Sequence, residues 1–281
     1  MVSPASLHLS FESAADGGTI LRVKQQQPPW RVVRGFPTPS GETLAHVHNV
    51  SGGVLATDSL SLRIDVEAYA QAQITTTGAT RIYRSRSVSQ AAVQHTEVEV
   101  REHAYLEYLP DQLIPFAGSR FQQTTRIMLH RDASLVWWEQ IAPGREAYGE
   151  SFCYESLRSG FEILAGGVPI AMERWILAPS LRPPDSVARM GPFRHFGTAY
   201  ICRSSEPAAY WKNFESEMQN IAEQQSSSEI LWGISSLSAG GLVIRGVSTS
   251  GRLLRDSWIE IWKSAKWRLC GRVAVVPRKV H

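Results

Sequence analysis

The chain has 281 residues, of which 43% are hydrophobic and 20% are charged, and its net charge is +3. These values are typical of a globular protein with a sizeable core and exclude a disordered chain. No run of 18 or more apolar residues is present, which excludes a simple transmembrane helix and predicts no membrane partner.

The residues up to about position 200 predict a succession of short strands. Apolar and polar side chains alternate in runs that recur about every ten residues, with turn residues between them, as in an all-β domain. The expected strands are Ser6–Phe11, Thr19–Lys24, Trp30–Val33, residues 60–67, residues 70–75, Thr80–Ser85, Thr96–Arg101, Ala104–Leu109, Phe121–His130, Ser134–Ile141 and Val168–Leu177. Before residue 200 no stretch shows helical periodicity.

The last third predicts two helices and a strand pair. Trp211, Phe214, Met218 and Ile221 recur at spacings of three and four residues, which favours a helix, with Ser205 as its N-cap and Pro207 in its first turn. A second helix is expected from about Arg252 to Leu269. The strands Leu231–Leu237 and Leu242–Val247 are expected between the helices.

The chain shows no linker and no repeat of fixed period. We therefore predict a single domain over residues 1–281, mainly β, with two helices in the C-terminal third. From the strand pattern alone, a β-sandwich is the default architecture.

Standard catalytic and nucleotide-binding motifs are absent from the sequence. There is no P-loop, no GxGxxG after a strand and no HExxH, and the segment Gly246–Ser250 does not complete a GxSxG nucleophile elbow. The cysteines Cys153, Cys202 and Cys270 are widely spaced and form neither a disulfide framework nor a zinc motif. We therefore predict no catalytic residue and no firmly bound cofactor.

Targeting signals and nucleic-acid surfaces are not indicated either. The first residues, MVSPASLHLSFES, lack the basic and apolar regions of a signal peptide, so we expect a cytoplasmic location. Arg81, Arg84 and Arg86 form a small basic cluster. With a net charge of only +3, this cluster is better interpreted as a strand edge or protein contact than as a nucleic-acid surface.

Two histidines could form a metal site. His46 and His48 are two residues apart, so on a strand both point to one face, and imidazole is a good ligand for nickel, zinc and copper. A third ligand would have to come from elsewhere in the chain. The simpler interpretation is a pair of hydrogen-bonded or solvated histidines.

Four carboxylates lie in or beside apolar segments, where an unpaired charge is costly. They are Asp58, Glu107, Glu139 and Glu173. The simpler interpretation pairs each of them with one of the many arginines. The functional alternative is a set of oxygen groups along a path for a hydrated cation.

Five segments, in order, resemble the urease accessory protein D family. They are His48–Gly53 with Asp58, Thr75–Ser85, Leu106–Pro110 with Ile114 and Phe116, Gly144–Phe152, and Gly271 with Pro277 and Arg278. The chain departs from the family pattern at Thr57, Thr77, Gly78, Pro143 and the last four residues, as expected for a divergent member.

The resemblance implies a β-rich, superhelical fold and a non-enzymatic role. Members of the family act with accessory protein F and the GTPase G, dock on apo-urease and assist the incorporation of nickel. GTP would then be bound by G, and nickel would be only in transit through this chain. On this view His48, Asp58, Glu139 and Glu173 are candidate groups along the nickel path, with the Gly52-Gly53 turn setting Asp58 against the interior. The alternative is a stand-alone metal-binding or hydrolytic β-protein that uses His46 and His48.

Overall fold

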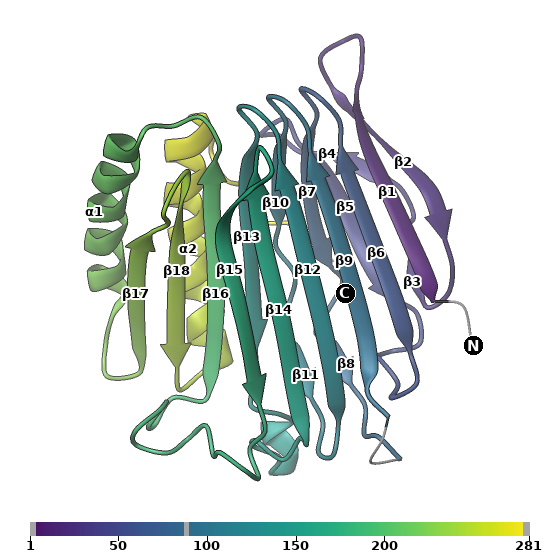
Figure 1. Cartoon of the computed structure of the whole chain (residues 1–281), viewed down its shortest axis with the longest axis vertical. Helices are drawn as coiled ribbons and strands as arrows, with labels where there is room; N and C mark the ends of the chain where they lie inside the picture. Colours follow the sequence, from purple (N-terminus) through teal and green to yellow (C-terminus); the bar gives the residue numbers. More distant parts are fainter. Residues whose placement is uncertain (1–3, 87–89, 278–281) are drawn as a thin grey trace.

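The computed structural model describes residues 4–86 and 90–277 and consists mainly of β-strands, with two α-helices in the last third of the chain (Figure 1). The predicted fold class is therefore confirmed. The strands form two large mixed sheets that face each other, and neither sheet closes into a barrel.

Seven strands form the first sheet, in the order β15-β14-β12-β9-β6-β1-β2. They are β1 (Ala5–Ser13), β2 (Thr19–Gln26), β6 (Ser59–Val66), β9 (Ala92–Val100), β12 (Arg120–Leu129), β14 (Ser156–Ala165) and β15 (Val168–Leu177). The strands from β1 to β14 run parallel, whereas β2 and β15, at the two ends, pair antiparallel to their neighbours.

Eleven strands form the second sheet, whose main path is β17-β18-β16-β13-β10-β7-β5-β3. These strands are β3 (Trp30–Arg31), β5 (Thr43–Asn49), β7 (Gln71–Thr76), β10 (Tyr105–Tyr108), β13 (Ser134–Ile141), β16 (His195–Arg203), β17 (Ile230–Ser236) and β18 (Gly241–Ser248). Three short strands pair beside this path: β4 (Gly35–Pro37), β8 (Thr80–Ile82) and β11 (Leu113–Pro115).

The chain winds between the two sheets as a superhelix. It passes from β6 to β7, from β9 to β10 and from β12 to β13, and each strand lies parallel to its equivalent in the next coil. The three corners have the same geometry, because Tyr69, His103 and Asp132 all adopt positive φ angles of 57–65°. The rings of Tyr69 and His103 stack with centroids 5.0 Å apart, and His103 Nδ1 lies 3.6 Å from Asp132 Oδ2.

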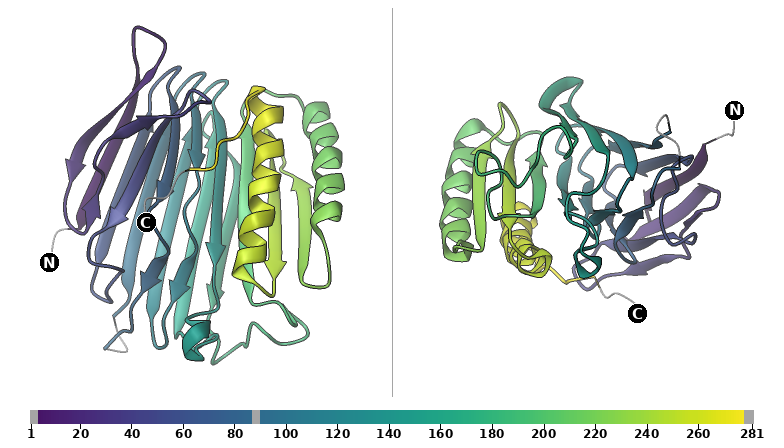
Figure 2. Two further views of the ribbon diagram at one scale, coloured as in Figure 1. Left: turned by 180° about the vertical axis from the view of Figure 1, so that it is seen from behind. Right: turned by 90° about the horizontal axis from the view of Figure 1, so that it is seen from below.

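The two helices cover the side of the eleven-stranded sheet that faces away from the seven-stranded sheet (Figures 1 and 2). Helix α1 (Ala208–Gln225) and helix α2 (Gly251–Cys270) bury tryptophan-rich stripes against β13, β16, β17 and β18, forming a second hydrophobic cluster beside the main core. The prediction of Ser205 as a helix cap was wrong: α1 begins after Pro207 and has no side-chain cap. Ser250 caps α2 by accepting a hydrogen bond from the Leu253 N–H.

Five strands escaped the sequence analysis: β4, β5, β11, β14 and β16. The residues Ala199–Cys202 of β16 are buried on both faces, because the main core lies on one side and the helical cluster on the other. A strand buried on both faces shows no alternation. The strand β14 does alternate, but Gly160 interrupts its pattern.

No helix in the described parts of the chain combines the length and the hydropathy needed to cross a membrane.

Candidate functional site

Polar side chains interrupt the apolar inner face of the seven-stranded sheet. Gln94 of β9, Gln123 of β12 and Ser159 of β14 occupy one register row on three adjacent parallel strands. Thr96 and Thr125 lie in the row beside it. Because polar groups inside a core need partners, this patch indicates that the interior facing it is polar.

Glu139, on β13 of the opposite sheet, faces this patch. Gln123 Nε2 donates a hydrogen bond of 2.9 Å to Glu139 Oε2. No salt bridge to Glu139 is formed by any of the residues that the structure describes. Burial raises the pKa of Glu139 to about 7, and the negative charge of Glu173 contributes in the same direction. Near neutral pH this carboxyl is therefore only partly ionised.

Glu173, on β15, is the second carboxylate in this region of the interior and acts on Glu139 through its negative charge. Tyr200 donates its hydroxyl hydrogen to Glu173 Oε2 over 2.5 Å, and Arg245 Nη2 lies 3.4 Å from Oε1. Burial and the hydrogen bond to Glu173 both raise the pKa of Tyr200 above its usual range, so the phenol stays protonated as a donor. These contacts link β15 to β16 and β18 of the other sheet.

Two cavities meet at Glu139. One, of about 70 Å³, borders Gln123, Gln94, Thr96 and Gln140. The other, of about 20 Å³, lies between β13, β14, β15 and β16 and borders Glu173 and Tyr200. Only Trp137, Glu139 and Ile141 line both. Glu139 is thus the one polar side chain common to the two cavities, whose volumes suit a few water-sized groups.

His48 and His46 lie elsewhere, on β5. Both are half-buried and alternate with the buried Ala45 and Val47, so they share the face of the strand that points away from the main core. Within the described part of the chain, no group of three or more His, Cys, Asp or Glu side chains could hold a metal ion. The histidine site therefore lacks the third ligand that it would need there.

Asp58 ends the turn that follows the glycine pair. Its Oδ2 accepts a hydrogen bond of 2.9 Å from the backbone N–H of Leu55, so the half-buried carboxylate caps its own turn. Gly53 is required in this turn, because a Cβ there would lie 2.7 Å from the carbonyl oxygen of Arg81. Neither His48 nor Asp58 lines the two cavities. The structure thus brings together Glu139 and Glu173 and leaves His48 and Asp58 apart from them.

Arginine pairing explains only one of the four carboxylates noted in the sequence. Arg245 pairs with Glu173, but Glu139 is held by an amide, Asp58 by a backbone N–H and Glu107 by a lysine. The sequence analysis did not identify Gln123 and Tyr200. Gln123 could have been found, because it interrupts the inward apolar row of Phe121, Ile127 and Leu129 on β12.

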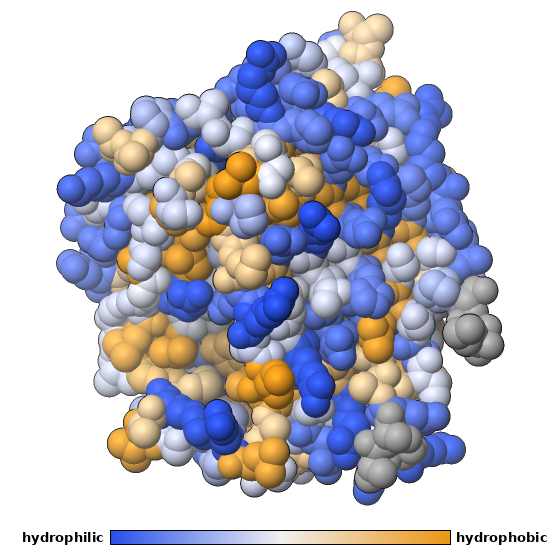
Figure 3. All heavy atoms as spheres, viewed as in Figure 1, coloured by the Kyte–Doolittle hydropathy of each residue, from blue (hydrophilic) through white to orange (hydrophobic). Residues whose placement is uncertain are grey.

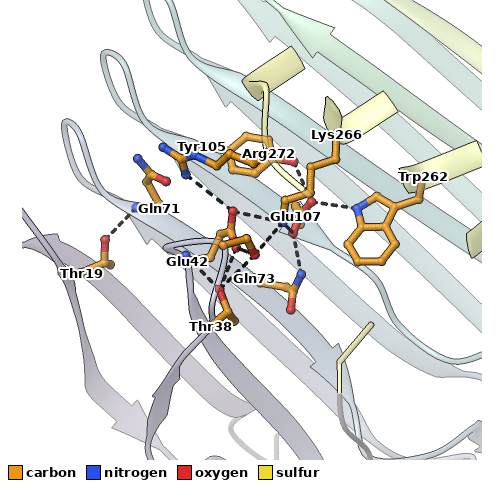
Figure 4. A network of polar contacts seen from close by, with 11 residues as sticks. Thr19, Thr38, Glu42, Gln71, Gln73, Tyr105, Glu107, Trp262, Lys266 and Arg272 are labelled. Carbon is orange, nitrogen blue, oxygen red and sulfur yellow. Dashed lines mark hydrogen bonds and ion pairs between the residues drawn. The ribbon is translucent and has the colours of Figure 1, made fainter. Parts of the chain in front are cut away.

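A second buried polar group joins α2 to the sheet (Figure 4). Lys266 Nζ lies 3.0 Å from Glu42 Oε1 and 3.0 Å from Glu107 Oε2, and all three side chains are fully buried. Glu107 also accepts hydrogen bonds from the Tyr105 hydroxyl, the Trp262 indole N–H and the Gln73 amide.

The charges in this cluster, defined here as Lys266, Glu42 and Glu107, are compensated. Burial alone would raise the pKa of Glu42, but the hydrogen bond from Ser40 and the positive charge of Lys266 outweigh it, so the pKa lies below its usual value. Arg272 lies 3.6 Å from the same carboxylate. The carboxylates of Glu42 and Glu107 thus contact the buried Lys266, and the half-buried Arg272 lies beside Glu42.

The fold and the site define a class of protein: a β-superhelix with a two-helix layer and a carboxylate-lined interior. The chain matches the family described as "UreD urease accessory protein" over residues 3–281. It therefore belongs to the UreD urease accessory protein family, as the sequence motifs indicated.

Relatives in this family match the chain over most of its length. The urease accessory protein UreD of Herpetosiphon aurantiacus is 45% identical over 264 residues, covering 94% of this chain and 92% of the relative. UreD 2 of Pseudomonas syringae pv. tomato is 30% identical, with 91% and 87% covered. UreD of a Nostoc species is also 30% identical, with 92% and 90% covered.

Proposed function

We propose that this chain is a scaffold for urease maturation. With accessory proteins F and G it would dock on apo-urease and assist the GTP-dependent incorporation of nickel, with GTP bound by G. The observation that carries the proposal is the family match over residues 3–281, together with 45% identity to a urease accessory protein. The cytoplasmic location expected from the sequence stays a prediction.

We infer further that nickel passes through the interior by way of Glu139 and Glu173. A carboxylate with a pKa near 7 and a second one shared with a tyrosine and an arginine attract a cation weakly. Weak attraction at several sites suits a cargo that must leave again, as in ion-conducting pathways. A closed set of strong ligands would retain the metal instead. The roles of His48 and Asp58 in such a path stay predictions.

The scaffold role is tested by reconstitution. Apo-urease, F, G, GTP and nickel should yield active, nickel-loaded urease with this chain present and much less without it. Pull-down on apo-urease should recover F and G only when the chain is included. Full nickel loading in the absence of the chain would contradict the proposal.

The alternative is a stand-alone metal-binding or hydrolytic protein based on His46 and His48. Equilibrium dialysis with nickel or zinc separates it from the scaffold role. Micromolar binding that disappears in His46→Ala/His48→Ala would support the alternative. Binding that is unaffected by the double substitution would exclude it.

A further inference from the structure

The strand β15 leaves one edge of the seven-stranded sheet unpaired. It has ten residues and pairs with β14, and none of its backbone groups bonds to any other element within the described ranges. In an end strand, alternate residues direct their N–H and C=O groups away from the sheet. Pro169 has no N–H and lies beside a register shift, so the regular edge that is available for pairing is Ala171–Leu177.

The second sheet extends beyond this edge. Across from β15 lies β16, and β18 and β17 continue past it, so their inner face is not covered by the seven-stranded sheet (Figure 1). Arg245 on this face reaches Glu173 of β15, and its side chain is 57% exposed. Leu231, on the same face of β17, is 47% exposed. An added strand beside β15 would continue the first sheet over this uncovered face.

The outer surface of β15 is unusually apolar for a sheet edge. Met172 and Ile176, which share its outer face, are 59% and 63% exposed. Figure 3, in the same orientation as Figure 1, shows hydrophobic side chains among the hydrophilic ones on the face that carries the seven-stranded sheet. At the opposite end of the sheet, β2 carries Arg22 and Lys24, both paired with Glu12. Charges of this kind protect an edge from pairing, whereas the outer surface of β15 carries one charged side chain, Arg174.

The charges near this edge are mainly positive. Residues 168–194 contain four arginines and two carboxylates. One of those carboxylates, Glu173, is already held by Tyr200 and Arg245, and one of the arginines, Arg194, is paired with Glu146. Arg174, by contrast, is exposed on the outer surface of β15. The charge complement of this edge is an acidic segment.

We propose that β15 is a docking edge for an extended, acidic segment of a partner protein, which adds to the seven-stranded sheet as a further strand. Main-chain hydrogen bonds supply the affinity in this mode of recognition, and side chains on alternate residues supply the specificity. Apolar side chains of the segment would cover Met172 and Ile176 outside and Leu231 inside. Its carboxylates would face Arg174, because Arg245 is already paired with Glu173.

The docking edge also borders the smaller cavity. Glu173 and Trp175 of β15 line that cavity together with Phe196 and Tyr200 of β16. A partner bound here would sit directly beside Glu173. This aspect rests on the proposed function, because it makes the bound partner the receiver or donor of the cation.

Hydrogen–deuterium exchange of the wild-type chain tests the proposal, free and in complex with F, G and apo-urease. We expect the amides of Ala171–Leu177 that are not bonded to β14 to exchange rapidly in the free chain and at least about tenfold more slowly in the complex. The amides of Thr19–Gln26 should change little. A complex in which β15 gains no protection would overturn the docking edge and leave the scaffold role standing. Failure of the wild-type chain to form any complex would overturn both.

Charged substitutions at the two ends of the sheet give a matched comparison. Met172→Lys/Ile176→Lys should weaken binding of the partner by about tenfold or more, because cross-strand neighbours of an added strand become charged. Ile20→Lys/Val23→Lys on β2, where the side chains are also exposed, should leave binding unchanged. Equal effects of the two variants would contradict the proposal, as would self-association of the free chain that disappears in Met172→Lys/Ile176→Lys.

Charge reversal separates an acidic partner from a neutral one. Arg174→Glu on β15 should weaken binding by about fivefold or more. Arg126→Glu, on the same outer surface but in the middle of the sheet, is the control and should have little effect. Unchanged binding in Arg174→Glu would exclude an acidic segment as the occupant.

Discussion

Two regions of the interior place glutamates in apolar surroundings but surround them with different partners. In the Lys266 cluster, two carboxylates share a buried ammonium at 3.0 Å, and Glu107 accepts further hydrogen bonds from a tyrosine, a tryptophan and a glutamine. Around Glu139, the carboxylate has one amide donor and borders two cavities. The first arrangement joins α2 to the sheet, whereas the second leaves a carboxyl group without a counter-ion among the described residues.

The effect of a buried carboxylate on the stability of the fold depends on the partners that surround it. Removing one partner of a compensated buried pair leaves the other charge buried and unpaired, which is strongly destabilising. A carboxyl group that is already poorly compensated is instead a cost to the folded state when it ionises. The two regions should therefore respond to substitution with opposite signs.

The largest effect is expected at the cluster. Lys266→Met leaves Glu42 and Glu107 buried without their shared cation and should lower the free energy of unfolding by about 3–5 kcal/mol, measured by urea denaturation. Lys263→Met on the same helix removes only a half-exposed pair with Glu260 and should change it by less than about 1 kcal/mol. In the triple variant Lys266→Met/Glu42→Gln/Glu107→Gln, much of the loss should be recovered. A small effect of Lys266→Met would show that the cluster is not what holds α2.

The second largest effect is expected at Glu139, whose replacement by glutamine should raise the free energy of unfolding. Its pKa is raised from 4.5 to about 7 in the folded protein, so the folded state binds more protons than the unfolded state between these values. The wild-type chain should therefore lose stability as the pH rises through this window, and the loss is complete above pH 7.

Glu139→Gln removes this loss while keeping a hydrogen-bonding side chain. It should raise the free energy of unfolding by about 3 kcal/mol at pH 8 and have little effect at pH 4. Denaturation of both chains at the two pH values measures the difference. Glu162→Gln is the control, at a half-buried glutamate on the outer face of β14 that pairs with Arg126. An equal effect of Glu139→Gln at both pH values would contradict a carboxyl group that titrates near neutrality.

The smallest effect is expected at the bridge between the sheets. Tyr200→Phe removes the hydroxyl that donates to Glu173 and should lower the free energy of unfolding by about 1 kcal/mol. Tyr83→Phe, which loses an exposed hydrogen bond to the Gly52 carbonyl, should lower it less. If both variants behave alike in urea denaturation, the Tyr200–Glu173 bond does not join the sheets.

The sequence predicts the fold best where one face of a helix or strand is exposed to solvent. The strands β6 and β12 and both helices alternate or repeat visibly, because each has one exposed side. The superhelical course follows from the family resemblance and not from the pattern, which favours a sandwich. The recurring corners at Tyr69, His103 and Asp132 are hidden, because their spacings of 34 and 29 residues differ and their residue types share no chemistry.

The candidate site is only partly readable from the sequence. Glu139 and Glu173 stand out as carboxylates in apolar strands: Glu139 directly follows Trp138, and Glu173 lies two residues before Trp175. They line one cavity because β15 lies across from β16, the neighbour of β13 in the other sheet, which no local pattern encodes. The Lys266–Glu42 pair joins residues 224 positions apart and is likewise invisible before the fold is known.

The central claim is that Glu139 and Glu173 handle the cation during delivery. It is tested most directly by the nickel content and activity of urease matured with Glu139→Gln/Glu173→Gln, compared with the wild-type chain and with Glu162→Gln. We predict that the double variant still forms the complex with F, G and apo-urease but lowers nickel loading by about tenfold or more, while Glu162→Gln matches the wild type. Full nickel loading by the double variant would contradict the claim.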